Sequence, residues 1–206
     1  MIDQLHQFQL YWDDFAHRFN IEKDRSCTIY EYLLNAYTEP HRHYHTVQHI
    51  IECLDHFQEI KANLNSPLLV ELAIWFHDVV YDPLAKDNEL QSAEKMKAFF
   101  SNFLPECAID QIFKWILASQ KHESSKDSDL SYFLDIDLAI LGSNEKRFLE
   151  YEKQIGDEYI AVKKEVYILK RAKVLEHFYS MEMIYKTPFF QEKFETNAKL
   201  NLVSLL

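Results

Sequence analysis

A chain of 206 residues with 48% apolar and 15% aromatic side chains has the size of one folded domain and carries too much bulk for a disordered protein. Its net charge of -11 argues against an extended basic footprint for nucleic acid, although a local pocket of Arg and Lys is compatible with that total. Only two glycines occur, Gly142 and Gly156, which argues against glycine-rich phosphate loops and favours helices.

Cysteine usage and the chain's apolar segments bear on its compartment. Cys27, Cys53 and Cys107 are odd in number and form no C-x-x-C pair, so we expect three small apolar side chains in a reducing cytoplasm rather than disulfides or a thiolate zinc site. No stretch reaches the ~18 apolar residues of a membrane span, and the N-terminus has no basic region of a targeting segment. The sequence therefore predicts a cytoplasmic protein with no membrane partner.

The first elements in chain order are helical. Apolar residues three and four apart predict an N-terminal helix with one aromatic stripe facing the core, made of Leu5, Phe8, Trp12, Phe15 and Phe19. A second helix is predicted over about 28–37 and ends before Pro40, because proline disfavours helix in the residue before it. The loop over 38–44 is polar and rich in histidine.

Two helices follow that carry most of the chain's chemistry. Thr46 is a good N-cap for a helix running to about residue 61, in which His45 and His49, four apart, lie on one side. The next helix opens at Ser66-Pro67 and continues to His77-Asp78, and its almost continuous apolarity makes it central. Pro83 ends that segment.

The remaining chain predicts further helices over about 88–103, 106–122, 129–141, 144–156, 158–181 and 189–204, separated by polar stretches. No clear repeat, low-complexity tract or linker divides them. We therefore predict an all-α fold, a single helical bundle in one domain over residues 1–206.

Several carboxylates occur in apolar surroundings. An ionised Asp78 at the end of an apolar helix is costly to bury unless a cation or hydrogen bonds compensate it. In the run from Phe133 to Leu141, Asp135 and Asp137 interrupt an otherwise apolar helix. Asp137 lies deeper in that run and is the better candidate for a metal ligand, with Asp135 as its outer partner or as an ordinary carboxylate near a helix N-terminus.

The order His49, then His77-Asp78, then Asp137 resembles the H…HD…D signature of the HD superfamily of metal-dependent phosphohydrolases, which are all-α. The segments EPHRHYHTVQHI, AIWFHDVVYDP, KDNELQSAE and FLDIDLAILG are similar to a bacterial subgroup of predicted HD phosphohydrolases of about this size, over nearly the whole chain. The resemblance implies that His49, His77, Asp78 and Asp137 ligate one divalent metal ion.

Two more histidines are candidates around that metal. Relatives with two metals add histidines, which makes His45 and His122 candidates for a second metal; the alternatives are an outer-shell His45 and a phosphate-contacting His122. Beyond the His-Asp pair, Asp82 and Asp87 resemble in placement the acidic residues that HD nucleotidases use near the attacking water. Asp82 would orient or deprotonate that water and Asp87 would support it or bind substrate, but a turn before Pro83 and a helix N-cap explain them equally well.

Arg42, in the histidine-rich loop, is the best candidate for a phosphate clamp because its planar fork matches two phosphate oxygens. Lys121 and Arg171 are weaker candidates of the same kind. Imidazole and carboxylate ligands suit Mn, Fe, Co, Ni or Zn better than Mg, which prefers oxygen.

Together these residues predict hydrolysis of a small phosphate ester, with nucleotides among the candidates, through a metal-activated water. The expected partner is a small phosphorylated substrate and not nucleic acid. Two alternatives remain: an HD-fold oxygenase that holds two irons, and a catalytically inactive module that binds a nucleotide for regulation. The sequence does not predict the oligomeric state.

Overall fold

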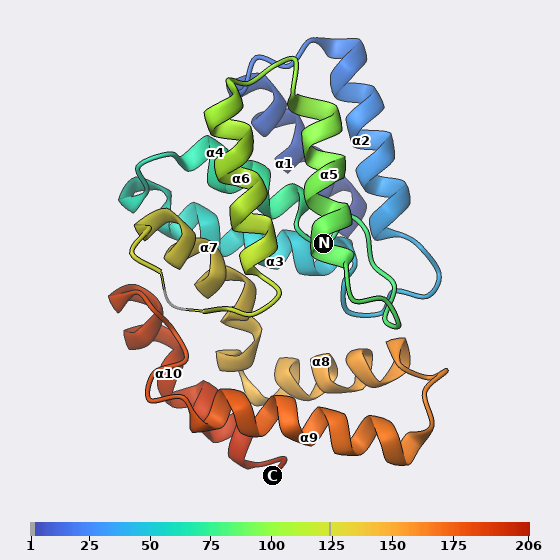
Figure 1. Cartoon of the computed structure of the whole chain (residues 1–206), viewed down its shortest axis with the longest axis vertical. Coiled ribbons are helices and arrows are strands. Elements are labelled where there is room, and N and C mark those ends of the chain that lie inside the picture. Colours follow the sequence, from blue (N-terminus) through green and yellow to red (C-terminus); the bar gives the residue numbers. More distant parts are fainter. Residues whose placement is uncertain (1–2, 124) are drawn as a thin grey trace. The chain divides into compact units, whose positions relative to one another are not determined.

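The structure is a computed structural model that describes residues 3–123 and 125–206. Over these residues the regular elements are helices, with no β-strand, which confirms the all-α prediction (Figure 1). The described residues group into two compact units, one reaching to Phe133 and one running from Leu134 to Leu206. Helix α7 (Ser128–Leu138) passes through that boundary as one continuous helix. The prediction of one domain over 1–206 stays a prediction.

The first unit is built around one apolar helix. Its elements before α7 are α1 (Gln4–Arg18), α2 (Lys23–Tyr37), α3 (Val47–Ile60), the 3-10 turn η1 (Lys61–Asn63), α4 (Pro67–Phe76), α5 (Asn88–Phe100) and α6 (Glu106–Ala118). Helix α4 contacts α3, α5 and α6, while α1 contacts α2 and α3. All α4 residues from Val70 to Phe76 are buried, so α4 is central, as its apolarity predicts.

The aromatic stripe of α1 packs against α4. The ring centroids of Phe8 and Trp12 lie 5.0 and 5.3 Å from that of Trp75, in edge-to-face geometry. Phe15 reaches the same ring at 6.4 Å. These rings carry a large share of the buried apolar area, because each aromatic side chain removes about 150–250 Å² from water. The prediction that the stripe belongs to the core is confirmed for Phe8, Trp12, Phe15 and Phe19, while Leu5 is 45% exposed.

A buried ion pair interrupts this apolar packing. The carboxylate of Glu71 on α4 is fully buried and accepts two hydrogen bonds from Arg18 of α1, at 2.7 and 2.8 Å. Burial raises the pKa of Glu71 to about 7, although the hydrogen bonds and charge of Arg18 lower it. The pair therefore fixes α1 against α4 with a group that changes its charge near neutral pH.

Helix ends differ from the sequence predictions where local backbone geometry intervenes. Helix α6 ends at Ala118 instead of residue 122, because the backbone from Ser119 to Lys121 makes three-residue turn hydrogen bonds and His122 then takes a left-handed φ of 52°. Helix α9 begins at Lys164 instead of 158, because successive turn hydrogen bonds occupy the preceding backbone, from Ile160 to Asp157 and from Val162 to Tyr159. Helix α2 begins at Lys23, five residues before the predicted start at 28.

The second unit contains the end of α7, the 3-10 turn η2 (Ala139–Gly142), α8 (Glu145–Glu158), α9 (Lys164–Ser180) and α10 (Pro188–Val203). Helix α10 contacts both η2 and α9. The carboxylate of Asp135 accepts hydrogen bonds at 2.7–3.0 Å from the backbone of Lys186 and from the backbone and hydroxyl of Thr187. Because Thr187 is the N-cap of α10, Asp135 holds the start of that helix.

The two glycines should respond oppositely to alanine. A Cβ on Gly142 would lie 2.6 Å from the Cβ and 2.7 Å from the backbone oxygen of Phe194, whereas a Cβ on Gly156 would meet only the hydroxyl end of Tyr167, at 3.6 Å. We expect Gly142→Ala to destabilise by about 1–3 kcal/mol through overpacking. Gly156→Ala, inside α8, should stabilise by about 0.5–1 kcal/mol. Urea unfolding of both variants checks the signs, and a neutral Gly142→Ala would contradict the packing described.

Within residues 3–123 and 125–206, none of the helices combines the length and the apolarity needed to cross a bilayer.

Candidate metal centre

The His-Asp pair stands where α4 stops. Helix α4 ends at Phe76, and His77 is its C-cap. The Nδ1–H of His77 donates to the carbonyl of Ile74 at 2.8 Å, so Nε2 is the nitrogen that would bind a metal once the ring has lost its second proton. That Nε2 lies 3.1 Å from Oδ2 of Asp78. His77 is thus a buried imidazole whose Nδ1 bonds to its own helix and whose Nε2 faces a carboxylate.

His49 brings a second imidazole to the same point. It lies in the first turn of α3 and is buried, with Nε2 at 3.1 Å from Nε2 of His77 and 3.4 Å from Oδ2 of Asp78. Tyr44 packs on its ring at 4.8 Å between centroids, and Sγ of Cys53 lies 3.7 Å from its Nδ1. Tyr44 and Cys53 therefore both contact the His49 ring.

The spacing of these three donor atoms suits one cation. A metal bonded at about 2.0–2.2 Å to nitrogen and oxygen holds neighbouring ligand atoms roughly 2.8–3.6 Å apart. The three separations here, 3.1, 3.1 and 3.4 Å, fall inside that range. Two imidazole nitrogens and a carboxylate oxygen this close together are unfavourable unless a proton or a metal lies among them. The residues present therefore fit a divalent metal.

Asp137 is the fourth member. The donor atoms of His49, His77, Asp78 and Asp137 all lie within 4.8 Å of one another, so this group could hold a metal ion. Helix α7 explains the placement locally, because Asp137 follows Phe133 by one helical turn and the Phe133 ring meets His77 edge-on at 5.8 Å. The structure thus brings Asp137 into the group and directs Asp135 to the start of α10.

Electrostatics favour an ionised Asp78. Burial acts to raise its pKa, but the charge of His77, hydrogen bonds with His49 and His77, and the charge of His45 together hold the pKa of Asp78 well below its usual range. Its side chain is 17% exposed, so part of the carboxylate side chain is in contact with solvent. The group therefore presents a negative carboxylate beside two imidazoles, the donor set that borderline transition metals prefer.

The structure corrects the prediction of a phosphate clamp at Arg42. Its side chain is fully buried, and its nitrogens donate to Glu39 Oε2 at 2.8 Å and to the carbonyls of His45, Asp78 and Val79 at 3.2, 2.7 and 3.0 Å. Those carbonyls need donors of their own, so the guanidinium satisfies the backbone around the centre and is not presented to a phosphate.

The two further histidines differ in position. His45 is half-buried, its ring 5.9 Å from that of His49 and stacked on Tyr81 at 4.1 Å. His45 therefore lies beside the group, and its two predicted roles, ligand of a second metal or outer-shell partner, stay predictions. His122 lies outside the group of four, in the left-handed turn after α6, and its predicted roles stay predictions.

The two acids proposed near the attacking water hold local turns. Asp82 is exposed; its Oδ1 accepts from the backbone of Leu84 at 2.8 Å, and its backbone pairs with the amide of Asn88. Asp87 is the N-cap residue of α5 and accepts from Gln91 at 3.3 Å. Neither belongs to the group of four. Their structural roles are therefore visible, whereas their catalytic roles stay predictions.

The remaining predicted cations are engaged or exposed. Lys121 is exposed with Glu123 at 4.0 Å, and Arg171 bonds Glu152 and, at 2.8 Å, the hydroxyl of Tyr151. Lys186, which no sequence pattern indicated, lies near enough to Asp135 and Asp137 for both to act on its pKa. Burial lowers the pKa of Lys186, and the charges of the carboxylates oppose this. Cys53 was not predicted as a neighbour of His49 either, although the spacing of four residues in a helix was a usable signal.

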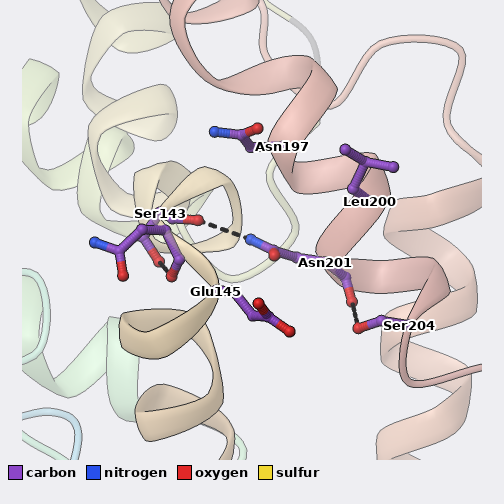
Figure 2. Close-up of a pocket in the computed structure, with 7 residues that line it drawn as sticks. Ser143, Glu145, Asn197, Leu200, Asn201 and Ser204 are labelled. Carbon is purple, nitrogen blue, oxygen red and sulfur yellow. Dashed lines mark hydrogen bonds between the residues drawn. The ribbon is translucent and has the colours of Figure 1, made fainter.

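A separate hollow of about 350 Å³ lies in the second unit (Figure 2). It is lined by Ser143, Asn144, Glu145, Asn197, Leu200, Asn201 and Ser204. Asn201 donates to the carbonyls of Leu141 and Ser143, at 2.8 and 2.9 Å, and Asn144 caps α8 through Arg147 N. Asn201 thus joins α10 to η2 and Asn144 caps α8, so these walls of the hollow have structural roles.

Comparisons of the chain with protein-family models, with curated proteins and with solved structures found no match. The resemblance to the HD superfamily therefore rests on the motifs and on the group of four residues that they name.

Proposed function

We propose that the protein is a metal-dependent phosphohydrolase of a small phosphate ester, with nucleotides among its substrates, in the cytoplasm. The observation that carries this proposal is the convergence of His49, His77, Asp78 and Asp137, whose donor atoms lie within 4.8 Å. A divalent metal held there would lower the pKa of a bound water and polarise a phosphoryl oxygen. The partly exposed side of Asp78 is where a small ester would approach.

The chain's own residues supply position and charge. His77 is fixed by Ile74 and His49 by Tyr44 and Cys53, so the imidazoles need no rearrangement to bind. His45, beside His49, is the nearest further imidazole and would contact a bound phosphate or hold a second ion. Lys186, whose pKa responds to the charge of Asp137, is a candidate cation to offset the charge of a phosphate.

A metal-supplemented screen of nucleotides and sugar phosphates tests the proposal, with Asp137→Ala as the control. We expect hydrolysis that requires Mn, Fe, Co, Ni or Zn, stops with a chelator, and falls at least about 100-fold in Asp137→Ala, because a lost ligand should exceed the effect of a lost outer-shell partner. Equal hydrolysis by Asp137→Ala would overturn the assignment. Two bound irons and consumption of oxygen would instead indicate an oxygenase. Nucleotide binding without turnover would instead indicate a regulatory module.

A further inference from the structure

We propose that Arg42 is a positioning residue of the metal centre, which sets the separation between the segment that carries His49 and the segment that carries His77 and Asp78. The inference rests on the metal site of the proposed function. It concerns how the ligands are held and adds no group that touches substrate.

One nitrogen of Arg42 joins the two segments directly. Its Nη1 donates to the carbonyl of His45 at 3.2 Å and to the carbonyl of Asp78 at 2.7 Å. The first carbonyl lies one residue before Thr46, the N-cap of α3, and the second belongs to a predicted ligand itself. Any change in the place of this nitrogen therefore moves the start of α3 relative to the His-Asp pair.

The other contacts of Arg42 hold that nitrogen still. Nη2 donates to Val79 O at 3.0 Å and Nε to Glu39 Oε2 at 2.8 Å. The guanidinium carbon lies 5.3 Å from the ring centroid of Tyr37 and 5.5 Å from that of Tyr81. The Tyr37 hydroxyl donates to Trp75 O in α4 at 2.9 Å, so one of these rings is itself anchored to the helix that ends in His77.

Only arginine satisfies this set of acceptors. The carbonyls of His45, Asp78 and Val79 and the Glu39 carboxylate are reached from three nitrogens in one plane, a geometry that matches the guanidinium fork. A lysine ammonium has three donors on one atom and cannot span acceptors on both segments in the same way. The buried guanidinium thus fixes the distances between backbone segments, and metal ligation is sensitive to shifts of about a few tenths of an ångström in the ligand positions.

The test compares cobalt(II) affinity of the full chain with that of three variants. Arg42→Met removes every donor, Arg42→Lys keeps the charge, and Ile29→Ala removes a fully buried side chain from α2, a helix that contributes none of the four ligands. Denaturant unfolding of the metal-free proteins shows whether Ile29→Ala is destabilised as much as Arg42→Met. Competition with a chromophoric chelator gives the dissociation constants, and the visible cobalt spectrum reports ligand geometry.

We expect the cobalt dissociation constant to rise about 10–100-fold in Arg42→Met, less in Arg42→Lys, and to stay unchanged in Ile29→Ala. The cobalt spectrum should change in the Arg42 variants alone. Unchanged cobalt affinity in the Arg42 variants, or an equal loss of cobalt affinity in Ile29→Ala, overturns the positioning role. If the wild type still binds cobalt in that case, the proposed function is unaffected. If Arg42→Met does not fold, Arg42→Lys decides. Wild type that binds cobalt but hydrolyses no ester sinks the proposed function and leaves this inference standing.

Discussion

We expect the variants His77→Ala and Asp78→Asn to lose bound metal and phosphatase activity together. His77 is 1% exposed with its orientation set by Ile74, and Asp78 lies 3.1 Å from it, so each variant removes one donor from a set of four. Loss of an outer-shell partner lowers metal affinity by up to about 100-fold, and we expect the loss of a ligand to lower it further. Phosphatase activity should fall with the metal content. Metal analysis after desalting and phosphatase assays on the same samples give both numbers.

Matched controls separate ligation from general effects of substitution. His17→Ala and Asp13→Asn remove an exposed imidazole and an exposed carboxylate from α1 and should leave metal content and turnover unchanged. Asp78→Asn keeps the shape of the side chain, so it preserves the fold better than a truncation does. Full metal content and normal turnover in both site variants would refute the assignment of these residues as ligands.

Arg18→Met should destabilise the protein by an amount that grows with pH. The substitution leaves the fully buried Glu71 carboxylate without its partner, and breaking a buried pair in this way costs about 3–5 kcal/mol. Burial already raises the pKa of Glu71 to about 7, and the loss of Arg18 removes the group that lowers it, so the folded pKa rises further in the variant.

The sign follows from proton binding. Between the unfolded pKa of 4.5 and about 7, the folded wild type binds the Glu71 proton more tightly than the unfolded chain, so this group makes stability fall as pH rises, by a total on the order of 3 kcal/mol. Above about pH 7 the wild-type contribution levels off, whereas the variant continues to lose about 1.4 kcal/mol per pH unit.

Urea unfolding of wild type and Arg18→Met between pH 5 and 9 measures the gap between their free energies of unfolding. It should be constant below pH 7 and widen above it. In a Glu71→Gln background the pH dependence of the gap should disappear, because the titrating group is gone. A gap that narrows as the pH rises above 7 would contradict the buried pair.

The all-α class of the fold could be predicted from the sequence, but not all helix ends and not the division into two units. The stripe Phe8, Trp12, Phe15 and the apolar run of α4 have the periodicity and length that define core helices, and both lie in the core. The early end of α6 could not be predicted, because a left-handed His122 is a single-residue event without a glycine or proline to mark it. The division into two units at Phe133 was not predicted either, since α7 runs through it as one helix.

The candidate site was accessible to sequence reasoning where residue type alone decides the chemistry. His49 and His77 were selected by the resemblance to the HD signature, whereas a carboxylate in an apolar segment needs a compensating cation, and this logic favours Asp78 and Asp137. It fails for Arg42, because sequence does not show whether a loop arginine turns outward to a phosphate or inward to three carbonyls. The distinction between Asp135 and Asp137 depends on which side of α7 each side chain faces. Depth in the apolar run favoured Asp137, which belongs to the group of four, but did not indicate that Asp135 would hold the start of α10.

X-ray absorption by the zinc-loaded protein tests the central claim most directly. Two imidazoles and two carboxylates predict a first shell of nitrogen and oxygen alone at about 2.0–2.2 Å, with outer scattering from two imidazole rings. Sulfur at about 2.3 Å would place Cys53 in the shell instead and contradict the ligand set. Zinc that does not stay bound through desalting would contradict the existence of the centre.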